Sequence, residues 1–394
     1  MHRAVIVDAV RTPIGRFGGG LCTRTAAELA AHVIAALIAR NGIEPETVDE
    51  VILGQVIQGG SGANIARTAA LRAGLPSAVC GTTVNMVCGS GMKALELARQ
   101  AIALGEGSIY IAGGAESMSN APFYLNELRW GHRLGRVSLL DGLMDEALRC
   151  PVTGIPMGLT AEEIASRTGI SRAESDAWAL RSQERARAAV QGGRFRDEIV
   201  PVPREEGEPL TTDEHPQETS QEGLASLKPV FKEDGSVTAG NASGINDGAA
   251  AALLVEETCA EIRRWKARAR IVASAMAGVE PEVMGLGPVP AVRALCQKIG
   301  ATPADFQLVE LNEAFAVQAL AVIRELELDP ERVNVNGSGI ALGHPLGATG
   351  ARIVVSLLYE MERRDVRLGL ATLCIGGGMG MAMALERDAA GKSQ

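Results

Sequence analysis

The chain has 394 residues, of which 46% are hydrophobic and 22% charged, so it has the composition of a globular protein. This length exceeds what one ordinary hydrophobic core supports and predicts two or more domains. A net charge of −9 argues against a nucleic acid or an anionic membrane as the partner.

Cysteine usage and the chain ends indicate the compartment. The seven cysteines form no CxxC pair, so neither a zinc site nor a disulfide framework is expected, and a reducing interior fits best. The N-terminus has no apolar signal core, and no apolar run is long enough to cross a bilayer. The C-terminal GKSQ is not a peroxisomal address. We therefore expect a cytoplasmic protein without a metal site.

Strand and helix patterns alternate in the first 117 residues. Strands are expected at 4–7, 48–57, 82–84 and 108–112, and helices at 25–39, 64–73 and from 92 onward. The segment 82–84 has the β-branched composition of the end of a buried strand. The alternation predicts a largely parallel sheet covered by helices on both faces.

The middle of the chain, from about residue 118 to 246, has a different texture. Thr160 with Glu163, and Ser171 with Glu174, have the spacing of capping boxes, and the second helix should run to about Val190. The stretch 204–223 is polar and acidic and predicts an exposed excursion. We expect the middle section to be an insertion laid over an α/β body.

The last third repeats the motif order of the first. Residues 269–278 resemble the opening strand, 305–315 the strand at 48–57, 333–358 the unit at 82–101, and 368–380 the strand at 108–112. Two α/β halves of the same design are therefore predicted, interrupted by the insertion.

Cys88 lies between a predicted strand and a predicted helix, next to Gly89, Ser90 and Gly91. Free backbone N–H groups and the positive end of a helix dipole favour a thiolate at such a position, which predicts a lowered pKa. The glycines would let a substrate carbonyl approach the backbone. The alternative is a buried, inert cysteine at a tight turn.

Three further side chains are candidates. His344 stands in GHPLGATG before an amphipathic helix and could act as a base, or could only cap or pack. Cys374 closes a buried strand before IGGGMG, and its alternative is a core cysteine. Asn312, between a strand and a helix, could be an N-cap or could hold a water or an oxyanion. A dinucleotide site is disfavoured because Leu342 replaces the third glycine of a GxGxxG motif.

The four stretches VNMVCGSG, NEAF, GHPLGATG and CIGGG, in this order, resemble the motifs of the thiolase family of acyl-CoA C-acyltransferases. The segments RTPIGRFGG, GGAESMS and AGNASGINDGAA extend the resemblance to the whole chain. It implies duplicated α/β halves with mixed sheets covered by helices, plus an inserted loop domain. The implied bounds are 1–117 with 247–267 for the N-terminal half, 118–246 for the loop domain and 268–394 for the C-terminal half. A homotetramer, built as a dimer of dimers, is also implied.

The resemblance also implies a ping-pong exchange between acyl thioesters. Cys88 would be acylated while His344 takes its proton, and Cys374 would move the α-proton of acetyl-CoA. Asn312 would hold a water at the enolate oxygen, and the amides of Cys88 and Gly376 would form the oxyanion hole. Coenzyme A is then a substrate, and no cofactor is required.

Substrate contacts follow from the same resemblance, which places Met157, Phe231, Ala239, Ser243, Ala314 and Phe315 around the acyl thioester. The chain departs from the family at DEHPQET, where Gln217 stands in place of an arginine, leaving Lys228 or Arg204 to bind the coenzyme A phosphates. Pro156 replaces the histidine of short-chain members, which favours making or cleaving acetoacetyl-CoA and also longer 3-ketoacyl-CoA. The alternatives are a strictly short-chain acetyl-CoA acetyltransferase, or a non-catalytic acyl-CoA- or lipid-binding relative.

Overall fold

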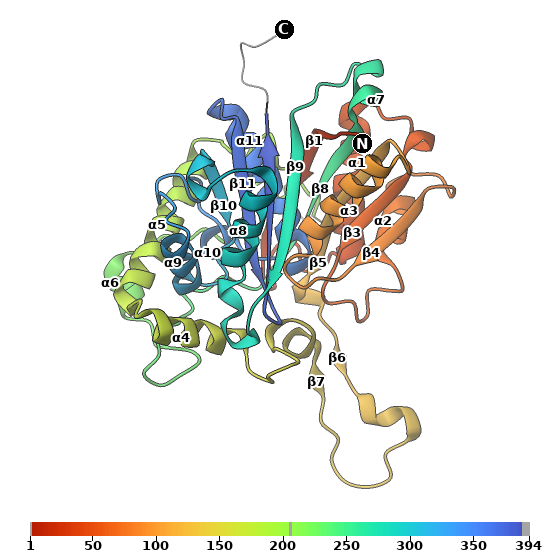
Figure 1. Cartoon of the computed structure of the whole chain (residues 1–394). Coiled ribbons are helices and arrows are strands. Elements are labelled where there is room, and N and C mark those ends of the chain that lie inside the picture. The colour runs from red at the N-terminus through yellow and green to blue at the C-terminus, as the bar shows by residue number, and fades with distance from the viewer. Residues whose placement is uncertain (1, 205–206, 388–394) are drawn as a thin grey trace.

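The computed structural model describes residues 2–204 and 207–387. The strands are β1 Ala4–Arg11, β2 Gly15–Arg16, β3 Glu50–Gly54, β4 Cys80–Val84, β5 Ile109–Ser117, β6 Phe123–Tyr124, β7 Leu140–Asp141, β8 Asn246–Glu256, β9 Ala269–Gly278, β10 Leu308–Leu311, β11 Leu368–Ile375 and β12 Met379–Glu386. The helices are α1 Ala26–Asn41, α2 Ile65–Arg72, α3 Ser90–Leu104, α4 Met157–Thr168, α5 Arg172–Gln191, α6 Gln221–Ala225, α7 Glu257–Ile262, α8 Pro288–Ile299, α9 Ala316–Glu325, α10 Gly339–Leu342 and α11 Leu346–Arg363 (Figure 1). The C-terminal GKSQ lies outside the described residues.

All of these strands except β6 and β7 form one mixed sheet in the order β10-β11-β12-β9-β1-β8-β5-β3-β4, with β2 beside β8, and β6 pairs with β7 separately. In the N-terminal half, β1, β8 and β5 pair antiparallel, whereas β5, β3 and β4 pair parallel. In the C-terminal half, β9, β12 and β11 repeat the antiparallel part, and β10 lies parallel to β11. A parallel bridge between Val309 and Val333 stands where β4 stands in the first half. The predicted duplication is confirmed.

The expectation of a largely parallel sheet is wrong. Each half contains a long strand, β8 or β12, that returns antiparallel between its neighbours. The strand β12, Met379–Glu386, was not expected as a strand of its own. The glycines just before it form a tight turn, which joins antiparallel strands, whereas parallel strands need a longer crossover.

Helices lie in layers on both sides of the sheet. Helices α3 and α11 share a central apolar cluster with the inner faces of both halves. Helices α1 and α2 cover the outer face of the N-terminal half, and α8 and α9 that of the C-terminal half. The helical positions predicted in α3 (Met92, Leu95, Ala98 and Ile102) are all fully buried. The two homologous helices α3 and α11 therefore meet in the middle of the molecule.

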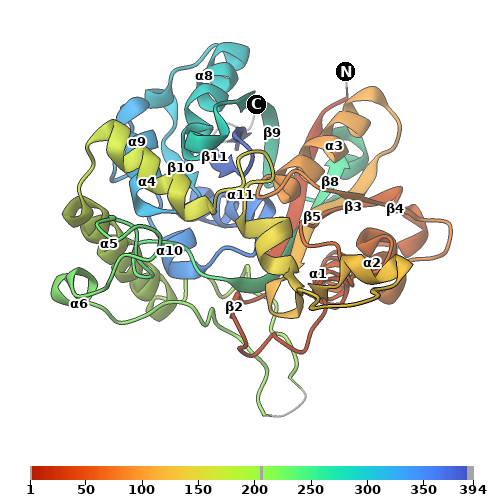
Figure 2. The same ribbon diagram turned by 90° about the horizontal axis from the view of Figure 1, so that it is seen from below.

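The insertion is carried mainly by the C-terminal half, where α4, α5 and α6 lie together (Figure 2). Helix α5 has Ser171 as its N-cap, in the predicted capping box with Glu174, and Gly192 as its C-cap. The Thr160 box is wrong, because α4 begins at Met157 and the Thr160 hydroxyl donates to the Met157 carbonyl inside the helix. The division at residues 117 and 246 stays a prediction.

Two other local expectations are corrected. Strand β4 is an exposed or half-buried edge strand rather than a buried one, since it pairs with β3 alone. The 204–223 excursion is exposed over most of its described length, but Asp213 is buried, where it accepts two hydrogen bonds from the Arg11 guanidinium. Arg11 also donates to Glu198, so a buried ion cluster fastens this excursion to β1.

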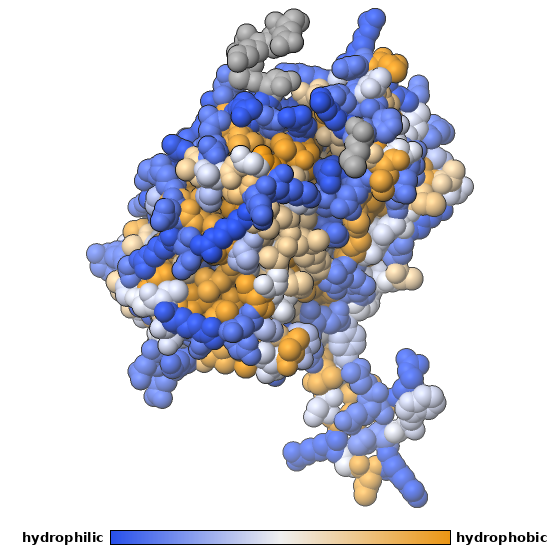
Figure 3. Space-filling view, in the orientation of Figure 1, coloured by the Kyte–Doolittle hydropathy of each residue, from blue (hydrophilic) through white to orange (hydrophobic). Residues whose placement is uncertain are grey.

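A hairpin arm formed by β6 and β7 stands out from the body (Figure 3). It exposes several large apolar side chains, namely Phe123, Leu128, Trp130, Leu134, Leu139 and Leu140. None of the helices in 2–204 and 207–387 is long and apolar enough to span a membrane.

Candidate active site

Cys88 lies in a short turn between β4 and α3 that is held by its own neighbours. The Ser90 hydroxyl accepts the Met86 N–H at 2.8 Å and donates to the Val87 carbonyl at 2.6 Å. The Asn85 side chain accepts the Val87 N–H at 2.9 Å. Val87 has φ of 48°, a strained value for a β-branched residue, which presents the following Cys88 at the helix end.

The expected lowering of the Cys88 pKa is wrong. Burial raises the pKa of this thiol to about 11, and Glu116 adds to the rise, although backbone N–H groups of Gly376 and Cys88 act in the opposite direction. The sulfur is therefore held as a thiol next to two amide donors, and its activation requires a base.

The N-terminal turns of α3 and α11 touch each other through glycines. A Cβ on Gly91 would lie 2.8 Å from the Ala351 nitrogen, and one on Gly350 would lie 2.5 Å from the Met92 nitrogen. Cys88 and His344 each stand two residues before the first residue of one of these helices. The close approach therefore brings both turns to the same end of the central layer.

His344 is buried and its imidazole has a defined tautomer. Its Nδ1 lies 2.6 Å from the Thr349 hydroxyl, which itself donates to the Pro345 carbonyl at 2.8 Å. Because that hydroxyl proton is already used, Nδ1–H donates to Thr349 and Nε2 carries the free lone pair. Burial, with a smaller contribution from Arg352, lowers the pKa of His344 to about 3. The ring is neutral and available as a proton acceptor.

Asn312 points its amide nitrogen at this ring, with Nδ2 3.4 Å from His344 Nε2. Its Oδ1 is buried without a hydrogen-bond partner among the described residues. A buried unsatisfied oxygen beside a base is a suitable position for a bound water. The N-cap alternative fails, because the N-cap of α9 is Phe315.

Cys374 lies at the end of β11, close enough to Cys88 to be affected by it electrostatically. Burial, followed by the nearby Cys88, raises the pKa of Cys374 far above its ordinary value. Ile375 packs against Gly89 in the Cys88 turn, and Gly376 reaches the Cys88 sulfur through its amide. The two thiols therefore belong to one site.

The expected substrate residues gather around Cys374, with one exception. Met157, Phe231, Ala314 and Phe315 share one apolar cluster with Cys374. The Ser243 N–H donates to the Ala314 carbonyl at 2.9 Å, which places Ser243 alongside. Ala239 is exposed and outside this cluster. Phe231 packs on Gly158, and Met157 lies over Gly376, so the cluster forms an apolar wall beside Gly376.

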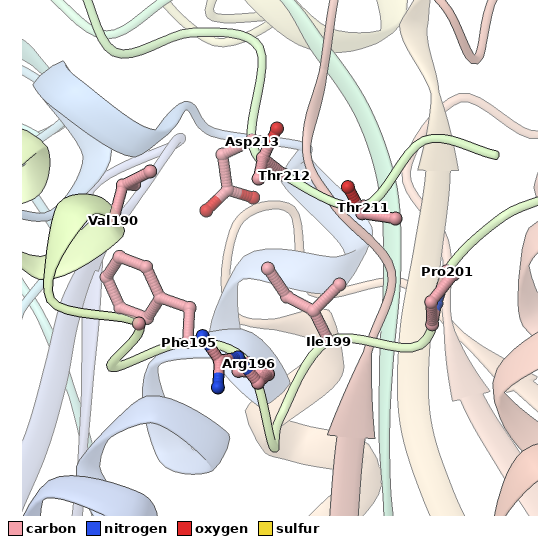
Figure 4. A pocket seen from close by; sticks show the side chains of 9 residues that line it. Val190, Phe195, Arg196, Ile199, Pro201, Thr211, Thr212 and Asp213 are labelled. Atoms are coloured by element: carbon pink, nitrogen blue, oxygen red, sulfur yellow. The ribbon is translucent and has the colours of Figure 1, made fainter. Parts of the chain in front are cut away.

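A separate cavity of about 300 Å³ lies between the segments 190–201 and 211–213 (Figure 4). It is lined by Val190, Gly193, Phe195, Arg196, Ile199, Pro201, Thr211, Thr212 and Asp213. None of the expected site residues lines it, and its buried carboxylate is already paired with Arg11. No cluster of His, Cys, Asp and Glu suited to a metal ion is found in the part of the chain that the structure describes.

Sequence reasoning missed three residues that contact the His344 turn. Thr349 fixes the imidazole tautomer, the Asn246 side chain accepts the His344 N–H, and the Glu116 carboxylate accepts the Gly347 N–H. All three lie inside the motifs GATG, GIND and GGAES, which were singled out only for their resemblance. For Asn246 and Glu116 the sequence gives no sign of the contact, because they are far from His344 in the chain, whereas Thr349 lies five residues after it.

Comparison with known proteins agrees with this geometry. Family models described as "Thiolase, N-terminal domain" and "Thiolase, C-terminal domain" match residues 4–258 and 265–387. The chain is 54% identical to an acetyl-CoA acetyltransferase of Chromobacterium violaceum, over 97% of this chain and 99% of the relative. It is 52% identical to that of Pseudomonas aeruginosa, over 98% and 100%.

Solved structures also match this chain over nearly its whole length. The crystal structure of the Bacillus anthracis acetyl-CoA acetyltransferase has a TM-score of 0.96 and 48% identity, covering 98% of this chain and 99% of that one. The crystal structure of human mitochondrial 3-ketoacyl-CoA thiolase has a TM-score of 0.96 and 42% identity, with the same coverage. The chain belongs to the thiolase family.

Proposed function

We propose that this protein is an acetyl-CoA C-acyltransferase that makes and cleaves acetoacetyl-CoA and longer 3-ketoacyl-CoA. One observation carries the proposal: Cys88 lies beside the Gly376 amide and beside a second thiol, Cys374, with a neutral imidazole at the adjoining helix end. Two thiols and one base can perform both nucleophilic attack and α-proton transfer.

In the first half-reaction the Cys88 sulfur attacks the thioester carbonyl while His344 Nε2 accepts the thiol proton. The amides of Cys88 and Gly376 stabilise the oxyanion. Collapse breaks the carbon–sulfur bond to coenzyme A, the departing thiolate receives the proton from His344, and an acyl-cysteine remains. The raised pKa of Cys88 and the lowered pKa of His344 keep both groups neutral before substrate binds.

In the second half-reaction Cys374, in its thiolate form, removes an α-proton from acetyl-CoA, and the carbanion attacks the acyl-cysteine. The Cys88 sulfur leaves as a thiolate, and the Cys374 thiol passes the proton to it, which restores both groups. His344 and a water held by Asn312 stabilise the enolate oxygen. A raised thiol pKa makes Cys374 a strong base as the thiolate and a reluctant acid as the thiol, which suits a weakly acidic carbon.

Acyl-chain length is set at the apolar wall formed by Met157 and Phe231. Pro156 is the N-cap of α4 and contributes no polar side chain there. Each methylene buried against this wall adds about 0.8 kcal/mol. We expect cleavage of acetoacetyl-CoA and also of medium-chain 3-ketoacyl-CoA, to be measured as kcat/KM for thiolysis of the C4, C8 and C12 substrates under one condition. Activity confined to C4 would leave a dedicated acetoacetyl-CoA enzyme.

The phosphates of coenzyme A are assigned to Lys228 rather than Arg204. Lys228 is exposed on the segment that ends in Phe231, which packs on Gly158 next to Met157. Arg204 donates to the Glu208 carbonyl and lies beside Gly20, away from that segment. Lys228→Ala should raise the KM for coenzyme A by about tenfold with kcat unchanged, whereas Arg204→Ala, the matched control, should leave both unchanged.

We also propose a cytoplasmic homotetramer. The β6–β7 arm exposes Trp130 to 93% and Leu134 to 91%, which is unfavourable for an arm that remains in water. Light scattering should give four chains per particle, and replacing both side chains with Ser should reduce that number.

The proposal as a whole is tested by acetoacetyl-CoA cleavage. The enolate absorbance of acetoacetyl-CoA with Mg²⁺ should fall when coenzyme A and the protein are added. An unchanged absorbance at every protein concentration, with acyl-CoA still bound, would favour the non-catalytic acyl-CoA-binding alternative.

A further inference from the structure

The turn that carries His344 belongs to the C-terminal half in sequence but is held by the N-terminal half. It comprises residues 343–347, which join α10 to α11. Two buried polar side chains outside the C-terminal half bond to its backbone, one at each end. The imidazole direction follows from this backbone, because Pro345 and Thr349 leave the ring little freedom relative to it.

Asn246, the first residue of β8, holds the start of the turn. Its Oδ1 accepts the His344 N–H at 2.9 Å, and its Nδ2 donates to the Gly15 carbonyl at 3.0 Å. The His215 ring lies 3.4 Å from the same nitrogen. Asn246 is fully buried, so a lost partner would not be replaced by bulk water.

Glu116, near the end of β5, holds the other end of the turn. Its carboxylate accepts the Gly347 N–H at 2.9 Å in the first turn of α11. It also accepts the N–H groups of Val56 and Ile57, just after β3, at 3.0 and 3.2 Å. Burial raises the pKa of Glu116 to about 8, so its contact with the turn consists of these hydrogen bonds rather than of a net charge. One buried carboxyl group thus joins the His344 turn to the end of β3.

Two glycines make these contacts possible. Gly343 has φ of 104°, and a Cβ there would lie 2.6 Å from the Asn246 side chain. A Cβ on Gly347 would lie 2.6 Å from the Ala115 carbonyl oxygen. The backbone of the turn is therefore pressed directly against both anchoring elements, with no side chain between them.

We propose that Asn246 and Glu116 are positioning residues that fix the direction of the His344 imidazole from the N-terminal half of the chain. The proposal deepens the thiolase function proposed above and rests on it. The anchors touch backbone rather than substrate, so their loss turns the base away from the Cys88 thiol without removing any group that binds coenzyme A. A displacement of about 1 Å costs on the order of 10²-fold in rate.

The first test is Asn246→Asp, which has the same shape but offers a carboxylate to the Gly15 carbonyl. We expect kcat to fall by about 10²-fold with KM changed by less than about threefold. The activity relative to wild type should recover as the pH is lowered from about 8 to about 6, because a protonated Asp can donate to Gly15 as the amide does.

The matched control is Asn64→Asp. The Asn64 side chain also accepts a backbone N–H, from Arg67, and donates to a backbone carbonyl, at Gly81, but it caps α2 and does not contact the His344 turn. Asp caps a helix about as well as Asn, so Asn64→Asp should keep kcat within about threefold of wild type. An equal fall in kcat for both Asp variants would overturn the positioning role.

The second test, Glu116→Gln, keeps the proposal falsifiable if Asn246→Asp does not fold. It should lower kcat by about 10-fold or more, because the amide nitrogen faces one of three N–H donors. Asp49→Asn is its control, since Asp49 accepts the Ser108 and Ile109 N–H groups away from the turn. Wild-type kcat retained in Glu116→Gln would contradict the proposal.

A second measurement separates this proposal from the proposed function. The rate of Cys88 alkylation by iodoacetamide needs no acyl-CoA, and His344→Ala supplies the rate without the base. Both anchor variants should fall towards the His344→Ala rate, while the controls stay at the wild-type rate. An inactive wild type would refute the thiolase function alone, whereas anchor variants alkylated at the wild-type rate would refute the positioning role alone.

Discussion

The same β–turn–helix unit occurs twice, and the two copies carry opposite halves of the chemistry. In the first copy β4 leads into α3 and presents Cys88, whereas in the second the bridge at Val333 leads towards α11 and presents His344. The first copy begins on an exposed edge strand, but the second is buried throughout residues 333–350.

The two turns also differ in what holds them. The Cys88 turn is fixed by hydrogen bonds from Asn85 and Ser90, within five residues of the thiol. The His344 turn depends on Asn246 and Glu116, which are 98 and 228 residues away from it by sequence number. The proposed nucleophile is thus positioned by local contacts and the proposed base by the assembled fold, and substitutions should affect the two turns differently.

The largest effect is expected for Cys88→Ser. An alcohol replaces the attacking thiol, so thiolysis should fall by more than about 10³-fold with the fold intact. Steady-state thiolysis of acetoacetyl-CoA is the measurement. Cys80→Ser, on the exposed part of β4, is the control and should keep wild-type activity. Substantial turnover by Cys88→Ser would assign the nucleophile elsewhere.

His344→Ala and Cys374→Ser should separate the two half-reactions. Loss of His344 should slow both acyl transfer and α-proton exchange by about 10²–10⁴-fold. Cys374→Ser should impair deuterium exchange at the acetyl methyl of acetyl-CoA while largely sparing acyl transfer to Cys88. Unchanged exchange in Cys374→Ser would mean that another group is the base.

Thr349→Val tests the one local contact of the His344 ring. Without the hydroxyl acceptor the Nδ1–H tautomer is no longer favoured, and kcat should fall by about 5–10-fold, the equivalent of about 1 kcal/mol. Thr349→Ser retains the hydroxyl and should restore most of the rate. Equal kcat in the Val and Ser variants would show that the Thr349 hydroxyl does not fix the tautomer of His344.

The pH dependence of stability should differ between the two turns. His344 has a folded-state pKa of about 3, below its ordinary 6.5, so the unfolded chain binds more protons and this contribution to stability is lost as the pH falls from 6.5 towards 3. Cys88 has a folded-state pKa of about 11, so its contribution is lost as the pH rises through 9 towards 11. Chemical denaturation of wild type, His344→Ala and Cys88→Ala over this range is the measurement. His344→Ala should weaken the fall in the free energy of unfolding on the acid side only, and Cys88→Ala on the alkaline side only. A variant that leaves its side of the pH profile unchanged would contradict the corresponding pKa.

Ser90→Ala tests the local hydrogen bonds of the Cys88 turn through stability rather than through activity. It leaves the Met86 N–H without its acceptor and should lower the free energy of unfolding by about 1–3 kcal/mol. The control, Ser226→Ala, removes an exposed hydroxyl bonded within its own turn and should cost less than about 0.5 kcal/mol. The free energies of unfolding are measured with a chemical denaturant. Equal losses in the two variants would show that the Cys88 turn does not depend on its local hydrogen bonds.

The sequence predicted what is encoded locally. Helix α5 begins at Ser171 as expected because both partners of the capping box lie within one turn. The duplicated order of the motifs also predicted that the Cys88 and His344 units are homologous, and the paired sheet halves confirm the duplication.

The features that could not be predicted from the sequence depend on residues that are far apart in the chain. The Cys88 pKa was predicted with the wrong sign because a helix N-terminus is visible in sequence, whereas the burial that outweighs it is not. Asp213 lies in a polar stretch and was expected to be exposed, yet the Arg11 guanidinium holds it inside. The roles of Asn246 and Glu116 were missed for the same reason.

The account is tested most directly by trapping the acyl-enzyme. Cys374→Ser protein is mixed with acetyl-CoA alone, quenched in acid and digested, and the peptide masses are measured by mass spectrometry. The account predicts one added acetyl group on the peptide containing Cys88, and its absence when Cys88 is replaced with Ala. Acetyl label on any other cysteine, or none on Cys88 while the enzyme turns over, would contradict it.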